Sequence, residues 1–133
     1  MAESDIEILR LFRRLALTGR GSASQPVSLP QPVVIQMMKM AFRDELDESW
    51  YLTQNPDVAE AIEKKSVKSA LDHFVASGIF EGRLPRAYPL DEQDYGQRHR
   101  DVAQSIEAGR VGSASEHFFR IGFIEGREFN LLA

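Results

Sequence analysis

The feature that most constrains how this chain can fold is an internal duplication. Residues 47–83 align with residues 91–127 at a constant offset of 44 positions, without a gap. Of the 37 aligned pairs, 17 are identical. A period of this length is typical of helical repeat units, which stack on one another to bury a shared core. The duplication therefore predicts two tandem copies of one folding unit.

Each copy carries the local signals of two helices. Asn55 followed by Pro56 predicts a helix start, because asparagine caps helix N-termini and proline suits the first helical position. Ser69 and its counterpart 44 residues later predict the start of the second helix. We expect Gly78 and its counterpart to end that helix in a left-handed conformation. The segment around Tyr51 is expected to be a short lead-in, and no segment alternates as a strand does.

The predicted fold class is all-α, with N-terminal helices followed by two tandem helical-hairpin repeats of 44-residue period. We expect three segments along the chain. The first, residues 1–18, is an amphipathic helix, and the second, residues 19–32, is a linker rich in glycine, serine and proline. The third, residues 33–133, is a helical domain that contains the repeat units 47–83 and 91–127.

The N-terminal helix is expected to bind a partner. A capping box at Ser4 and Glu7 predicts its start. A helix of this length is marginally stable alone in water, so its wide apolar face must be covered. We expect another chain to cover it, either a different protein or a second copy in a homodimer or larger homo-oligomer. The residues of this face are Ile8, Leu9, Leu11, Phe12 and Leu15.

The composition excludes several classes of function. The chain of 133 residues has no cysteine, which excludes a disulfide framework, a thiolate metal site and a cysteine nucleophile. The net charge of −4 and the acidic, aromatic second helices argue against nucleic-acid binding. No apolar run is long enough for a transmembrane span, and the acidic first residues are not typical of a signal peptide. We expect a cytoplasmic protein.

A set of polar residues recurs in both copies and has two interpretations. As a structural clasp, the arginines pair with carboxylates of their own hairpin and the imidazoles bond a neighbouring group. As a ligand site, the same groups bind a polar molecule. The clasp is the simpler interpretation, since polar residues duplicated with a repeat commonly serve the repeat. Two histidines without further ligands predict no metal site, and no pattern predicts a cofactor. The residues are Asp57, His73, Glu81 and Arg83, with Asp101, His117, Glu125 and Arg127.

A third helix, expected over residues 33–46, contains several methionines. Met37, Met38 and Met40 are suited either to core packing or to an adaptable surface for partner binding. Core packing is the commoner use of such residues.

The string YLTQNPDVAEAIEKKSVKSALDHFVASGIFEGR, residues 51–83, resembles a known bacterial repeat. That repeat has the form YLxxNPDVA, then SAxxHF, then GxxEGR, and belongs to glycosyltransferase-associated and other surface-polysaccharide biosynthesis proteins. The resemblance extends over residues 47–127. The second copy departs from the pattern where His99 and Arg100 replace the Asn-Pro pair. The resemblance implies a helical fold and a bacterial context of exopolysaccharide synthesis.

These observations predict a non-catalytic protein–protein interaction or regulatory accessory protein. Its expected partner is a protein, such as a glycosyltransferase or another component of polysaccharide synthesis. The alternative is a carbohydrate- or nucleotide-sugar-binding module that uses the repeated acidic and arginine residues, with Trp50, Tyr51 and Tyr95 as stacking platforms. An enzymatic function is not expected, because no catalytic constellation stands out.

Overall fold

The computed structural model describes residues 2–18 and 27–133, and over these residues the chain is all-α. The extended pairing found there is an isolated antiparallel bridge between Leu90 and Leu131. Among the described helices, none combines the length and the apolar character needed to cross a membrane. Most of the expected linker, residues 19–26, lies outside the described residues.

The chain divides into two compact units, each of which contains one copy of the repeat. The first-repeat unit is Leu15–Ala87, and the second-repeat unit combines Met1–Arg14 with Tyr88–Ala133. The helical domain expected over residues 33–133 includes parts of both units, and the N-terminal segment is divided between the units after Arg14.

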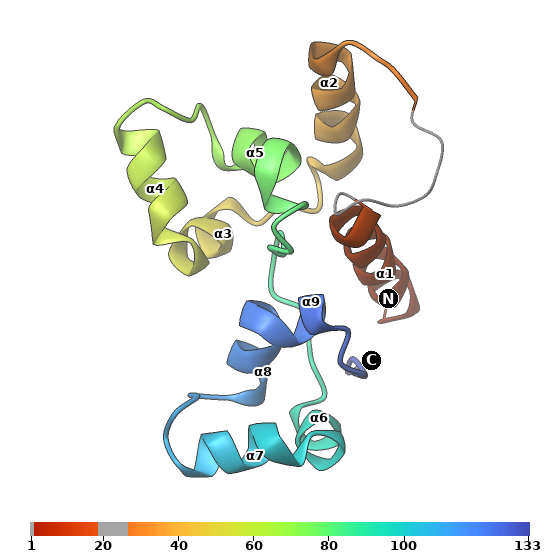
Figure 1. Ribbon diagram of the computed structural model, residues 1–133, viewed down its shortest axis with the longest axis vertical. Helices are drawn as coiled ribbons and strands as arrows, with labels where there is room; N and C mark the ends of the chain where they lie inside the picture. The colour runs from red at the N-terminus through yellow and green to blue at the C-terminus, as the bar shows by residue number, and fades with distance from the viewer. Residues whose placement is uncertain (1, 19–26) are drawn as a thin grey trace. The chain divides into compact units, whose positions relative to one another are not determined.

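The first-repeat unit is built from α2 and three short helices that contact one another (Figure 1). A π-helical segment, η1, continues directly from α5 and also packs against α2. The bounds are Gln31–Phe42 for α2, Glu48–Gln54 for α3, Pro56–Glu63 for α4, Ala70–His73 for α5 and Phe74–Gly78 for η1.

The second-repeat unit contains the same succession of helices, each beginning and ending 44 residues later (Figure 1). It also includes the greater part of α1, Ala2–Thr18, and the short α9, whose equivalent residues 79–81 form a turn in the first copy. The bounds are Glu92–Arg98 for α6, Arg100–Glu107 for α7, Ala114–His117 for α8, Phe118–Gly122 for η2 and Phe123–Glu125 for α9.

Side-chain caps fix the starts of several helices. The Ser69 hydroxyl accepts a hydrogen bond from Asp72 N at 3.1 Å, and the Ser113 hydroxyl accepts one from Glu116 N at 3.0 Å. Each cap satisfies a backbone N–H that the first turn of a helix leaves without a partner. Asp47 caps α3 in the same way, through Trp50 N.

Several local expectations differ from the structure. The lead-in around Tyr51 is itself the helix α3, so each copy has three helices before its π-helical segment. The helix α1 begins at Ala2, ahead of the capping box expected at Ser4. Asn55 precedes α4, but its side chain does not cap the helix. Its Nδ2 donates instead to Tyr51 O at 2.7 Å.

The glycine expected to end the second helix of each copy has a different role. Gly78 lies inside the helical path of η1 and does not have a positive φ. The left-handed residue is Gly82, with a φ of 78°, and Gly126 is its equivalent with a φ of 80°. A Cβ on Gly78 would lie under 3.0 Å from Tyr51 Oη. The position therefore requires glycine because a buried tyrosine approaches the backbone closely.

An aromatic pair forms the centre of each unit. In the first-repeat unit, the Tyr51 and Phe74 rings meet edge to face with centroids 5.7 Å apart, and Phe42 of α2 meets Phe74 at 6.3 Å. In the second-repeat unit, Tyr95 and Phe118 repeat the first contact at 5.8 Å. All four aromatic side chains of these Tyr–Phe pairs are 0% exposed. They therefore supply much of the apolar burial that stabilises each unit.

Candidate functional site

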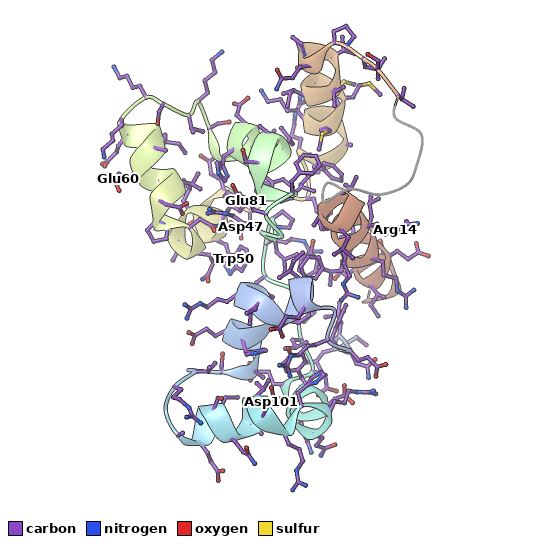
Figure 2. All side chains as sticks on the ribbon, viewed as in Figure 1. Arg14, Asp47, Trp50, Glu60, Glu81 and Asp101 are labelled. Carbon is purple, nitrogen blue, oxygen red and sulfur yellow. The ribbon has the colours of Figure 1, made fainter. Side chains whose placement is uncertain are left out.

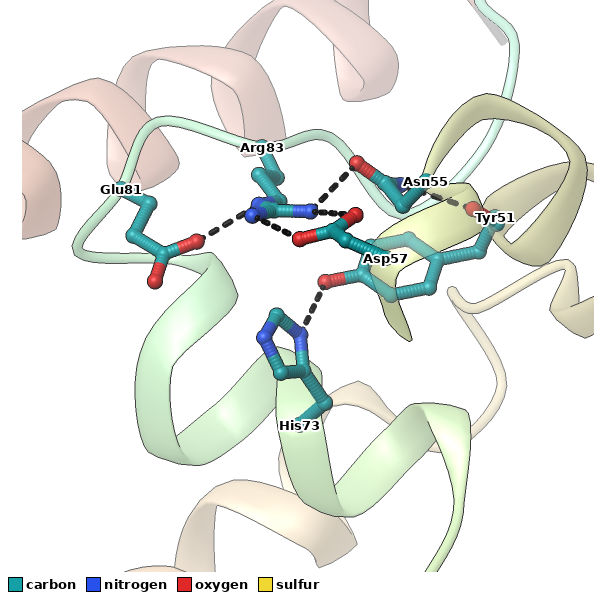
Figure 3. Close-up of polar contacts among 6 residues, drawn as sticks. All are labelled: Tyr51, Asn55, Asp57, His73, Glu81 and Arg83. Carbon is teal, nitrogen blue, oxygen red and sulfur yellow. Dashed lines mark hydrogen bonds and ion pairs between the residues drawn. The ribbon is translucent and has the colours of Figure 1, made fainter. Parts of the chain in front are cut away.

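The repeated arginine of the first-repeat unit is the centre of a polar cluster (Figure 3). Arg83 binds Asp57 with two nearly parallel hydrogen bonds, of 2.9 Å from Nη1 and 2.8 Å from Nη2. Its Nε donates to Glu81 at 2.6 Å, and Nη1 also donates to Asn55 Oδ1 at 2.9 Å. Four of the five guanidinium N–H groups therefore have a partner.

The second-repeat unit has the same cluster with one replacement. Arg127 binds Asp101 with two hydrogen bonds of 2.8 Å and donates from Nε to Glu125 at 2.8 Å; Asp101, on α7, is labelled in Figure 2. His99 stands where the first copy has asparagine, and its Nε2 bonds the backbone carbonyl of Glu128 at 2.8 Å. The arginine–carboxylate geometry is thus the same in both units, while the neighbouring contact differs.

The backbone positions these charges at the end of the π-helical segment. Gly82 adopts a left-handed conformation, with a φ of 78°, which turns the chain so that Glu81 and Arg83 can meet. Arg83 N donates to Gly78 O at 2.9 Å, which ties the turn to the helix before it. Asp57 reaches the same place from the first turn of α4. The cluster therefore joins the start of α4 to the end of η1.

A tyrosine–histidine pair lies beside each cluster. Tyr51 Oη and His73 Nδ1 are hydrogen-bonded at 2.9 Å, and Tyr95 Oη and His117 Nδ1 at 3.0 Å. Each bond connects the first and third helices of its copy of the repeat, α3 with α5 and α6 with α8. The histidines do not contact the arginines through any hydrogen bond found among the described residues, so the predicted set divides into an ion-pair cluster and a separate Tyr–His pair.

The ion pairs change the acidity of their members strongly. The hydrogen bonds from Arg83 lower the pKa of Asp57 from its ordinary value near 3.8 to about 2. Arg127 lowers the pKa of Asp101 to about 2 by the same cause. The reciprocal hydrogen bonds from the carboxylates raise the pKa of both arginines. Both pairs therefore remain charged over the whole neutral range.

The Tyr–His pair has the opposite character, since burial dominates it. Desolvation, followed by the positive charge of the nearby arginine, lowers the pKa of His73 and of His117. Burial also raises the pKa of Tyr51, and it raises that of Tyr95 to about 12. At neutral pH the pair is an uncharged imidazole bonded to an uncharged phenol, which is an arrangement suited to a buried contact.

The structure contradicts one part of the sugar-binding alternative and reveals residues that sequence reasoning missed. Tyr51 and Tyr95 are 0% exposed, so the expectation that they are stacking platforms is wrong; both rings are required in the core. The sequence did contain a signal for the pairing of these tyrosines with the histidines. In both copies a tyrosine stands 22 residues before the histidine. The role of Asn55 had no such signal, because the second copy replaces it.

The predicted partner-binding face of α1 is partly covered within the single chain. Leu9 and Phe12 are 0% and 1% exposed. Ile8, Leu11 and Leu15 are half-buried. The argument that another chain must cover this face therefore does not apply to Leu9 and Phe12, and binding through the rest of the face stays a prediction.

Over the described residues, no group of three or more histidine, aspartate or glutamate side chains is placed to hold a metal ion. Comparison with protein-family models, curated proteins and solved structures gives no match for this chain. The interpretation of the site therefore depends on its geometry and on the sequence repeat.

Proposed function

We propose that this chain is a non-catalytic interaction protein built from a tandem repeat of 44 residues, in which the arginine cluster is the structural clasp of each copy. The carboxylates that a ligand would have to displace already bind Arg83 and Arg127 in bidentate geometry. Such pairs are among the stronger polar contacts in proteins. This occupancy supports the clasp over a sugar-binding role for the same residues.

The observation that carries the proposal is an exposed apolar stripe on α2. Val33, Met37 and Met40 are 45%, 57% and 69% exposed. Their spacing of four and then three residues places them on one face of the helix. Methionine side chains adapt to differently shaped partners, and exposed apolar surface of this kind marks interaction sites.

The opposite face of α2 explains why the stripe points outward. Phe42 is buried against Phe74, and Lys39 forms an ion pair of 2.6 Å with Asp72 of α5. These contacts fix the rotation of the helix within the first-repeat unit. The stripe is therefore a stable feature of this unit, and we assign it, rather than α1, as the main partner-binding surface. Met38 is half-buried and belongs to the inner face.

The biological context that we propose is bacterial surface-polysaccharide synthesis in the cytoplasm, with a synthesis component such as a glycosyltransferase as the partner. Its support is the resemblance of residues 51–83 to repeats of such proteins. A homo-oligomer formed through the same stripe is part of the proposal, since an apolar helix face can also bind its own copy.

The test is complementation in a strain of the source bacterium from which the gene has been deleted. We expect surface polysaccharide to fall on deletion and to be restored by the parent chain, but not by the double variant Met37→Glu, Met40→Glu. The matched control is Gln36→Glu, which adds a charge to an exposed position of the same helix outside the stripe. Trp50 fluorescence checks that each variant is folded.

Two results would contradict separate parts of the proposal. An unchanged polysaccharide level after deletion would refute the context, and full restoration by the double variant would refute the stripe. Light scattering of the purified chains tests self-association, because a dimer formed through the stripe should become a monomer in the double variant and stay a dimer in the control.

A further inference from the structure

The second-repeat unit contains a cavity of about 320 Å³ in which positive charge predominates. Two of its lining residues, Arg10 and Arg13, come from α1, which places them one helical turn apart. Arg98 and Arg127 line it from the repeat itself, and Glu128 is the carboxylate residue of the lining.

The two lining arginines that belong to the repeat, Arg98 and Arg127, are neutralised by carboxylates. Arg98 Nε lies 2.8 Å from Asp94 Oδ2, and its Nη1 lies 3.1 Å from Glu128. Arg127 is held by Asp101 in the clasp described above. These two side chains therefore add little uncompensated charge to the cavity.

The two α1 arginines that line the cavity, Arg10 and Arg13, have no such compensation among the described residues. No ion pair links Arg10 or Arg13 to a carboxylate among the described residues. Arg13 Nε donates to the backbone carbonyl of Phe123 at 3.2 Å, and its guanidinium lies over the rings of Phe123 and Phe129, at 5.5 and 5.9 Å from their centroids. Its Nη2 is buried and has no hydrogen-bond partner among the residues that the structure describes.

An unneutralised guanidinium beside a second one is electrostatically unfavourable. Burial, and then the positive charge of Arg10, lower the pKa of Arg13. A buried polar nitrogen without a partner is itself uncommon in proteins and calls for an explanation. A negative charge in the cavity would offset the repulsion between the two guanidinium groups, because it would attract both cations.

We propose that this cavity binds a small oxyanion, a phosphate or carboxylate group of a low-molecular-weight ligand. Arg10 is exposed at the cavity and supplies the direct contact, with the fork geometry that arginine offers to such groups. Arg13 contributes its charge through space, since its Nη2 is covered. Phe129 forms an apolar wall beside the anion.

The size of the cavity restricts the ligand. A volume of about 320 Å³ is at the lower end of the range for small-molecule sites. It fits a phosphate or a small phosphorylated or carboxylated molecule. The cavity lies in the second-repeat unit, whereas the apolar stripe lies in the first-repeat unit. A result that refutes one of the two proposals therefore leaves the other unaffected.

The experiment measures binding of inorganic phosphate and of acetate to the full chain by NMR chemical-shift titration, at an ionic strength held constant with sodium chloride. We expect saturable shifts at residues 126–130 with phosphate. Arg10→Gln should weaken binding about tenfold, as expected for loss of one charge-assisted contact. Arg110→Gln is the matched control, because it removes the same charge from an exposed position of the same unit outside the cavity.

The possible results distinguish phosphorylated from carboxylated ligands, and two of them would refute the proposal. Tighter binding of phosphate assigns the site to phosphorylated ligands, and equal or tighter binding of acetate that depends on Arg10 assigns it to carboxylates. Absence of saturable shifts with both anions up to tens of millimolar would overturn the proposal. An equal loss in Arg110→Gln would also overturn it, because general charge attraction would then explain the binding.

Discussion

The close approach of Gly78 to Tyr51 allows a quantitative test of the core of the first-repeat unit. A Cβ at position 78 would lie under 3.0 Å from Tyr51 Oη and 3.3 Å from Phe74 Cδ1. The tyrosine cannot move away cheaply, because it is 0% exposed and its Oη is bonded to His73 at 2.9 Å. Gly78→Ala should therefore destabilise this unit, although alanine is the better helix former.

The magnitude follows from two opposing effects. Forcing a methyl group into a packed core costs about 1–3 kcal/mol, and alanine favours a helix over glycine by about 0.5–1 kcal/mol. The expected net loss for Gly78→Ala is thus about 1–2 kcal/mol in the free energy of unfolding. Tyr51→Phe alone should cost about 1–2 kcal/mol, because it removes the hydrogen bond and leaves His73 Nδ1 without its partner.

The double variant distinguishes this explanation from a general intolerance of substitution. Without Oη, the nearest tyrosine atom to the new methyl group is Cζ, at 3.5 Å, which is an ordinary contact distance. The contact of the new methyl group with Phe74 Cδ1, at 3.3 Å, remains in the Tyr51→Phe background and offsets the helix preference of alanine. Gly78→Ala should therefore be close to neutral in that background, within about 0.5 kcal/mol. The coupling energy between the two positions is then about 1–2 kcal/mol.

The assay is urea denaturation of the full chain followed by fluorescence. Trp50 is the chain's single tryptophan and adjoins Tyr51 in α3, so its emission reports on the first-repeat unit. Additive effects in the double variant, or a Gly78→Ala chain as stable as the parent, would refute the close-contact explanation of the glycine.

Three further predictions concern the clasp and a cap. Arg83→Ala should lower the free energy of unfolding by about 1–2 kcal/mol. The control is Arg120→Ala, which removes a 73% exposed partner of an i,i+4 pair and should change the free energy of unfolding by less than about 0.5 kcal/mol. Equal effects of the two substitutions in urea titrations would contradict the clasp. Because the folded-state pKa of Asp57 and of Asp101 is lowered to about 2 from 3.8, their contribution is complete above the unfolded value and is lost as the pH falls from about 4 to 2. The free energy of unfolding measured against pH should show this loss. The loss should be less than about 1 kcal/mol per pair, because both carboxylates are 63% exposed. In Arg83→Ala the pH-dependent loss should be smaller. Ser69→Ala should cost about 1 kcal/mol by removing the cap of α5, and an unchanged urea midpoint would show that water replaces the cap fully.

The parts of the fold that the sequence could predict are those encoded locally. Ser69 caps the helix that it was expected to cap, because an N-cap depends on residues within one turn. Gly109, just after the end of α7, takes the left-handed conformation that glycine commonly adopts at helix ends, with a φ of 72°. The helix α3 was missed because seven residues are too few to display a clear 3.6-residue period.

The parts that could not be predicted depend on residues far apart in the sequence. Gly78 was assigned to a helix end by a local rule, but the group that requires glycine there is Tyr51, 27 positions earlier. Asn55 fits a local capping rule equally well, yet its side chain bonds Arg83 and Tyr51 O. In both cases a tertiary contact replaces the local role, which no single-sequence pattern reveals.

The comparison of the two copies indicates where function is to be sought. The groups that they share, the arginine–aspartate clasp and the Tyr–His pair, have the same geometry in both units and are satisfied within them. Shared, satisfied groups explain why each copy folds, and they cannot explain what distinguishes one unit from the other. The largest difference is the helix that each unit adds to its repeat. The first adds α2 with its exposed methionines, and the second adds most of α1, whose Arg10 and Arg13 form no ion pair among the described residues. We therefore propose that recognition is located on these added helices, with an apolar partner at α2 and an anionic ligand at α1.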